Sequence, residues 1–157
     1  MSSRRAWGMW TVISVGLVIL AGTVLYDRSN GERRSESSPH RLARGAQAYD
    51  EHCAACHGAN LEGQRDWRKR GPDGLLPAPP HDATGHTWHH PDQQLFAITK
   101  YGTAAVVGPE YKTTMGGFED VLDDDEIRDV LAFIKSRWPE EIRRRQAGIT
   151  ARARNAD

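Results

Sequence analysis

The run Cys-Ala-Ala-Cys-His at residues 53–57 constrains this chain more than any other feature, because it contains both of its cysteines. Two thiols at positions i and i+3 can reach the two vinyl groups along one edge of a porphyrin. The imidazole of His57 follows Cys56 directly and can bind the porphyrin iron from one face. The motif therefore predicts one covalently attached c-type haem, linked through Cys53 and Cys56, with His57 as an iron ligand.

Three other chemistries use a pair of nearby cysteines. A thioredoxin-like redox pair would lie in an alternating α/β pattern, which this sequence does not show. A structural zinc or copper site would need further ligands, and the chain has seven histidines that could supply them. A disulfide between Cys53 and Cys56 would close a very small loop and would remove little chain entropy. We expect haem attachment, with the metal and thiol-redox interpretations as alternatives.

Residues 7–26 are apolar and carry no charge. A helix of about 20 residues spans about 30 Å, the thickness of the hydrocarbon core of a bilayer. Trp7, Trp10 and Tyr26 stand near the two ends, where aromatic side chains favour the membrane interface. The alternative is a cleaved signal peptide, but residues 20–22 form only a weak cleavage site and the apolar run is long for one. We predict an uncleaved transmembrane anchor.

The composition divides the chain around this anchor. A folded domain is expected after a polar, charged linker that cannot bury enough apolar surface to fold. The domain is net acidic and both flanks are net basic, with no pattern typical of a nucleic-acid surface. The basic C-terminal tail is expected to be solvated, although its arginines could also touch anionic lipid. The predicted parts are a cytoplasmic tip (1–6), the anchor (7–26), the linker (27–38), the domain (39–138) and the tail (139–157).

Helical signals punctuate the domain, and no segment shows sustained two-residue alternation. Ser38 and Pro39 suit the N-cap and the first position of a helix that runs almost to Cys53. A middle helix is expected between Pro91 and Gly102. Residues 58–90 and 103–120 are expected to be mostly irregular, and long loops in a compact domain usually carry function.

The final helix has the clearest signals. Asp123 is an expected N-cap, and Glu126, three residues later, would complete a capping box. Trp138 extends the apolar face of this helix, and Pro139 discourages continuation. The face itself has the spacing i, i+3, i+4, i+7 and consists of Ile127, Val130, Leu131 and Ile134.

A second iron ligand can be sought by elimination. Of the three methionines, only Met115 lies in the predicted domain. It precedes Gly116 and Gly117, and a glycine-rich loop lets the backbone approach a flat ring closely. A methionine ligand would raise the reduction potential. The alternatives are a core methionine that fills a gap, or a bis-histidine haem that uses one of His81, His86, His89 and His90.

Residues 40–138 resemble the class I cytochrome c family. The strongest points of resemblance are the motif at residues 53–57 and Met115 before a terminal amphipathic helix. Gly45 and Tyr49 match a small and an aromatic residue that pack on the last helix in this family, where Phe133 or its neighbours would meet them. The resemblance implies an all-α haem domain of three to four helices with long loops, here preceded by the single transmembrane helix.

The resemblance also implies details of the haem pocket. A prolyl carbonyl should accept a hydrogen bond from the proximal histidine, and Pro77 is slightly favoured over Pro79. Trp88, Arg68 and Arg70 would support the haem propionates. Covalent haem attachment in bacteria occurs on the outer side of the cytoplasmic membrane, which would place the N-terminus inside and the haem domain in the periplasm.

These features predict a non-enzymatic, membrane-tethered electron carrier with one haem c and with His57 and Met115 as axial ligands. Its expected donor is a quinol-oxidising complex or a dehydrogenase, and its expected acceptor is a terminal oxidase or reductase of a respiratory chain. One alternative is a fixed cytochrome subunit of an oxidase or dehydrogenase. Others are a haem sensor in which Met115 dissociates, and a metal-binding module that uses the stretch from His86 to His90.

Overall fold

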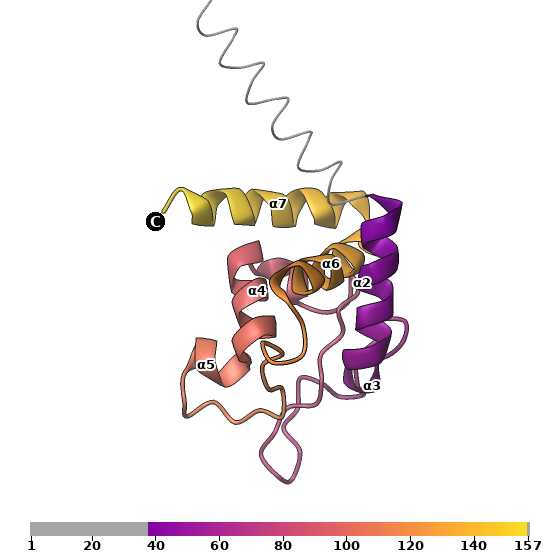
Figure 1. Ribbon diagram of the computed structural model, residues 1–157. Helices are drawn as coiled ribbons and strands as arrows, with labels where there is room; N and C mark the ends of the chain where they lie inside the picture. Colours follow the sequence, from indigo (N-terminus) through magenta and orange to yellow (C-terminus); the bar gives the residue numbers. More distant parts are fainter. Residues whose placement is uncertain (1–37, 157) are drawn as a thin grey trace, which may run out of the picture. The chain divides into compact units, whose positions relative to one another are not determined.

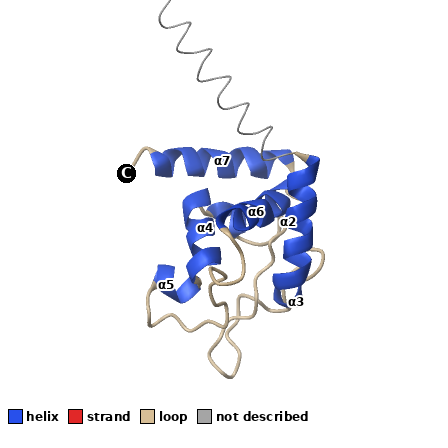
Figure 2. Cartoon of the chain, viewed as in Figure 1, coloured by secondary structure: helices blue, strands red, loops and turns tan. Residues whose placement is uncertain are grey.

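The computed structural model describes residues 38–156, which belong to one compact unit. The described residues form α-helices and a 3₁₀ helix but no strand, so the predicted all-α fold is confirmed for them. Figure 1 and Figure 2 show the arrangement. The elements are α2 (Pro39–His52), α3 (Ala54–His57), the 3₁₀ helix η1 (Thr87–His89), α4 (Asp92–Tyr101), α5 (Thr103–Val107), α6 (Asp124–Ser136) and α7 (Glu140–Arg154).

The predicted cytoplasmic tip and membrane anchor lie outside the described residues, as does the linker up to residue 37. Within residues 38–156, no helix has both the length and the apolar character that crossing a membrane requires. The membrane anchor therefore stays a prediction from the sequence.

Helices α2 and α6 cross closely, and Gly45 lies at the crossing. A Cβ atom built on Gly45 would overlap the backbone carbonyl of Asp129 and would lie 3.1 Å from Cβ of Phe133. One turn further along α2, the ring of Tyr49 packs against the ring of Phe133 with centroids 5.5 Å apart. The predicted contact of Gly45 and Tyr49 with the amphipathic helix, which is α6, is therefore confirmed.

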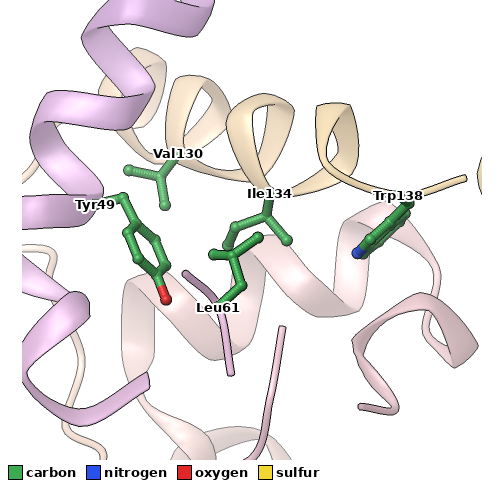
Figure 3. Close-up of a cluster of buried hydrophobic side chains, with 5 residues drawn as sticks. All are labelled: Tyr49, Leu61, Val130, Ile134 and Trp138. Atoms are coloured by element: carbon green, nitrogen blue, oxygen red, sulfur yellow. The ribbon is translucent and has the colours of Figure 1, made fainter. Parts of the chain in front are cut away.

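The buried apolar cluster connects this helix pair to the long loop after α3. The hydroxyl of Tyr49 donates a hydrogen bond to the carbonyl of Gly58 (2.8 Å). The indole nitrogen of Trp138 donates to the carbonyl of His81 (2.7 Å). The first bond joins α2, and the second joins the residues just after α6, to the long loop that follows α3. The cluster in Figure 3 consists of Tyr49, Leu61, Val130, Ile134 and Trp138.

Most of the expected C-terminal tail forms helix α7, whose side chains are mostly exposed, as the prediction of a solvated tail implies. Proline disrupts the interior of a helix but is tolerated where a helix begins. Pro139 is the N-cap residue of α7, directly before Glu140. Gln146 and Thr150 are buried. The amide of Gln146 donates to Oδ1 of Asp92 (2.7 Å), and the backbone N–H of Asp92 donates to the hydroxyl of Thr150 (3.0 Å). Polar contacts therefore attach α7 to the start of α4.

A buried ion pair also joins α2 to α6. The side chain of Asp129 is only 2 % exposed and accepts hydrogen bonds from the guanidinium groups of Arg41 and Arg44. Burial alone would raise the pKa of Asp129, but the hydrogen bonds from Arg41 and Arg44 outweigh it and hold that pKa below its usual value.

We predict that Asp129→Asn lowers the free energy of unfolding by about 2 kcal/mol at pH 7, because three charge-assisted hydrogen bonds weaken. A carboxyl whose pKa is lower in the folded state stabilises fully above its unfolded pKa of about 3.9 and less as the pH falls through the folded value. The difference between the two proteins should therefore shrink from about pH 4 downward. Urea denaturation at a series of pH values measures it.

The matched control for this prediction is Asp125→Asn on the same helix. The side chain of Asp125 is 85 % exposed and pairs with Arg128. Exposed pairs of this kind contribute about 0.3–0.5 kcal/mol. Equal losses in the two variants, or a loss for Asp129→Asn that does not change with pH, would show that the buried ion pair does not stabilise the crossing.

Candidate functional site

The two cysteines lie on one helical turn. Helix α2 ends at His52, and its C-cap residue Cys53 is also the N-cap of α3. The backbone N–H groups of Cys56 and His57 both donate to the carbonyl of Cys53, at 3.1 and 2.9 Å. Neither cysteine is in a disulfide; Cys53 is half-buried and Cys56 is exposed. Burial, with a smaller contribution from Cys56, raises the pKa of the Cys53 thiol to about 11, so this thiol is protonated at neutral pH.

His57, the next residue of the motif, is buried and held by one hydrogen bond. Its ring nitrogen Nδ1 lies 2.8 Å from the carbonyl oxygen of Pro79. Because a carbonyl only accepts, Nδ1 carries the proton and Nε2 keeps its lone pair. Burial lowers the pKa of His57, and the bond to Pro79 offsets part of this shift. The side chain is therefore a neutral imidazole with one nitrogen free to bind a metal, the form in which histidine is an iron ligand.

The acceptor is Pro79, so the preference for Pro77 was wrong. Alternate residues of an extended segment direct their groups the same way, which is why the sequence did not separate the two prolines. Gln64 sets the register: its backbone N–H donates to the carbonyl of Ala78, and its side-chain oxygen accepts from the Ala78 N–H, both at 2.8 Å. Gly63 packs tightly against residues 78–80, because a Cβ there would meet the carbonyl oxygen of Ala78 at 2.9 Å.

His81, one of the alternative iron ligands, lies beside His57. The two rings are stacked, with centroids 3.9 Å apart and planes inclined by 22°. Nδ1 of His81 lies 2.8 Å from the hydroxyl of Thr87. Burial, followed by the neighbouring His57 and His86, lowers the pKa of His81 to about 3. Axial ligands bind iron from opposite faces of a haem, whereas the stacked rings of His57 and His81 lie on the same side. This arrangement disfavours His81 as the ligand opposite His57. Apart from a histidine two residues after the acceptor, no local sequence signal indicates this stack.

Met115 lies on a segment whose backbone is attached to the end of α4. Gly116 forms an isolated antiparallel bridge with Gly102, which has a positive φ of 89°. The N–H of Phe118 donates to the carbonyl of Lys100 at 3.0 Å. The N–H of Met115 donates to the hydroxyl of Thr113 at 3.0 Å, and its side chain is half-buried. The short helix α5, which the sequence did not predict, leads into this segment.

The three residues expected at the haem propionates each have a partner in the protein. The indole nitrogen of Trp88 donates to the carbonyl of Ala83 (3.3 Å). The guanidinium of Arg68 lies 4.0 Å from the ring centroid of Trp67, and Arg70 donates to the carbonyl of Gly74 (2.7 Å). Their role at the propionates stays a prediction.

The histidines in the stretch from His86 to His90 contact aromatic rings and one another. His86 stacks on Trp67 with centroids 5.4 Å apart, and His89 stacks on Trp88 at 3.7 Å. Burial lowers the pKa of His86, and the nearby His90, His89 and Arg68 lower it further. Among residues 38–156, no group of three His, Cys, Asp or Glu side chains is placed to hold a metal ion. The metal-binding alternative therefore has no support in this part of the chain.

The donor set fits a covalently attached haem: two free thiols on one turn, followed by a buried neutral imidazole whose free nitrogen can bind iron. Fold and site together define an all-helical haem protein of the c type. The family model described as "Cytochrome c" matches residues 42–138, and the chain belongs to that family. It carries haem c, with Cys53 and Cys56 in the expected spacing, and it is an electron-transfer protein. Comparisons with curated proteins and with solved structures gave no match.

Proposed function

We propose that the chain is a membrane-tethered carrier with His57 and Met115 as axial ligands to one haem c. It passes single electrons, on the outer side of a bacterial cytoplasmic membrane, from a quinol-oxidising complex or dehydrogenase to a terminal oxidase or reductase. The observation that carries the proposal is the hydrogen bond from His57 to Pro79 beside two free thiols. Membership of the cytochrome c family supports the electron-transfer part.

The histidine and the two cysteines of the site have different roles. When bound, haem supplies an iron that changes its oxidation state by one electron. The bond from Nδ1 of His57 to Pro79 fixes the orientation of the imidazole and raises its basicity as a ligand. Cys53 and Cys56 would hold one edge of the porphyrin beside α3. Because Cys56 is exposed, that edge would be accessible to a partner protein.

Met115 is the proposed second ligand because it is the one methionine of the haem domain. Its backbone is anchored through the Gly102–Gly116 bridge and the hydrogen bond from Phe118 to Lys100, which supports a fixed position for the sulfur. His57 and Met115 would together occupy both axial positions and leave none for a substrate, so we expect electron transfer without catalysis.

Membrane tethering is proposed from the sequence of residues 7–26 and from the polar linker at 27–38. A flexible tether keeps a domain at high effective concentration near partners in the same membrane. This arrangement suits a carrier that must meet a donor and an acceptor in turn.

We predict that Met115→Ala abolishes the sulfur-to-iron charge-transfer band of the ferric protein and lowers the reduction potential, since axial ligands set haem potentials over a range of about 0.8 V. The reduced variant should also bind carbon monoxide, which the wild-type protein should not. Visible spectroscopy and spectroelectrochemistry measure these changes.

The control for this prediction is Thr114→Ala, an exposed neighbour in the same loop. It should leave the band and the potential unchanged. A wild-type protein without the band, or an Met115→Ala spectrum equal to that of the wild type, would contradict methionine ligation and favour a histidine in its place.

A further inference from the structure

We infer that His81 is a positioning residue for the iron ligand His57: its ring, stacked on the imidazole of His57, sets the plane of that imidazole. The inference deepens the proposed function and depends on His57 being an iron ligand. The stack has a centroid separation of 3.9 Å and an interplanar angle of 22°. These values describe two rings stacked face to face and in contact.

The position of His81 is fixed by its backbone as well as by its side chain. Its N–H donates to the carbonyl of Leu61 (2.8 Å), and its carbonyl accepts from the indole of Trp138 (2.7 Å). Leu61 and Trp138 are both members of the buried apolar cluster. The backbone of His81 is therefore attached to the most buried part of the domain.

The ring of His81 has a partner of its own. Its Nδ1 lies 2.8 Å from the hydroxyl of Thr87, a buried residue. That hydroxyl donates to the carbonyl of Pro80 at 3.5 Å. In the arrangement that satisfies all three groups, Nδ1–H of His81 donates to Thr87, and Thr87 donates to Pro80. The ring of His81 is therefore held by its own hydrogen bond in addition to those of its backbone.

The contacts from Pro79 and His81 restrain different motions of His57. The carbonyl of Pro79 fixes the direction of the Nδ1–H bond. The face of His81 opposes rotation of the His57 ring out of the stacked plane. Both contacts come from the single segment 79–81, so the orientation of the ligand is set by one short piece of backbone.

If the side chain at position 81 only filled space, an imidazole would be an unfavourable residue there. Burying a polar ring costs free energy unless its polar atoms are bonded, and here Thr87 has to supply the partner. An aliphatic side chain would fill the same volume without that requirement. A flat ring, unlike an aliphatic side chain, can hold a second flat ring parallel to itself. This property accounts for a histidine at position 81.

The test compares His81→Leu and His81→Phe in the full chain matured with haem. The proton NMR spectrum of the ferric protein reports the plane of the ligand, because the paramagnetic shifts of the haem methyl groups depend on imidazole orientation. We expect a displaced methyl pattern in His81→Leu and a pattern close to the wild type in His81→Phe, which restores a flat ring. His89→Leu is the matched control, since His89 stacks on Trp88 rather than on a ligand, and it should leave the pattern unchanged.

A wild-type methyl pattern in His81→Leu would overturn the inference, as would equal displacement in the Leu and Phe variants. If His81→Leu does not mature, Thr87→Val replaces it: this variant keeps the ring of His81 but removes its partner, and an unchanged pattern would again overturn the inference. Failure of the proposed function looks different. A wild-type protein whose ferric spectrum is not that of a low-spin, histidine-ligated haem would remove the basis for both.

Discussion

Replacing Cys53 and Cys56 together with alanine is expected to abolish covalent haem attachment. Both thiols lie on one turn ahead of His57, and neither is in a disulfide. Without them, His57 and the rest of the pocket can hold haem only by coordination and packing. A pyridine haemochrome spectrum of the acid-extracted, denatured protein should show no haem. Each single variant should mature poorly and retain one thioether bond, with a band position typical of one unsaturated vinyl group.

The control is Ala55→Ser, because Ala55 lies exposed between the two cysteines. It keeps the spacing of the thiols and should give the same yield and spectrum of covalent haem as the wild type. If the double cysteine variant retained haem through denaturation, the assignment of the attachment site would be wrong, and the account of His57 as the proximal ligand would lose its main support.

The second large effect is expected from Gly45→Ala. Glycine in the interior of a helix usually costs about 1 kcal/mol relative to alanine, so this substitution normally stabilises. Here a Cβ would overlap the backbone of Asp129 at the crossing of α2 and α6. Backbone atoms cannot move aside as a flexible side chain can, so the helices must separate. Overpacking of this kind costs about 1–3 kcal/mol and occasionally more, a large part of the 5–15 kcal/mol typical of a folded domain.

Gly148→Ala is the matched control, because it makes the same change inside α7. A Cβ there would meet only the end of the Arg152 side chain, at 3.5 Å. Thermal unfolding of the matured proteins should therefore show a lower melting temperature for Gly45→Ala and an equal or higher one for Gly148→Ala. Stabilisation by Gly45→Ala would mean that the two helices do not cross as closely as Figure 1 shows.

The parts of the fold that sequence predicted well depend on neighbouring residues. Ser38 caps α2, and the side chains of Asp123 and Glu126 form the expected capping box at the start of α6. Such signals are readable because donor and acceptor lie within a few positions of each other. The cysteine motif is readable for the same reason, since one helical turn places both thiols and the histidine together.

The parts that sequence did not predict depend on contacts between distant residues. The choice between Pro77 and Pro79 follows from the pairing of Gln64 with Ala78 across a long loop. The stack of His81 on His57 requires that loop to return to the motif. Helix α7 has a polar buried face, with Gln146 and Thr150 inward, so the usual apolar periodicity of a packed helix is absent. None of these contacts has a local signature.

The pairing of Gln64 with Ala78 has a consequence for how this protein can change. The two hydrogen bonds between Gln64 and Ala78 close the loop of residues 65–77 where it begins and ends. They lie next to Pro79 but do not involve the carbonyl that accepts from His57. The segment inside this closure, which includes the exposed Arg65 and Lys69, can change in length or sequence while the acceptor keeps its place. Descendants of this chain could therefore acquire new partners at this spot and keep the same electron-carrying centre.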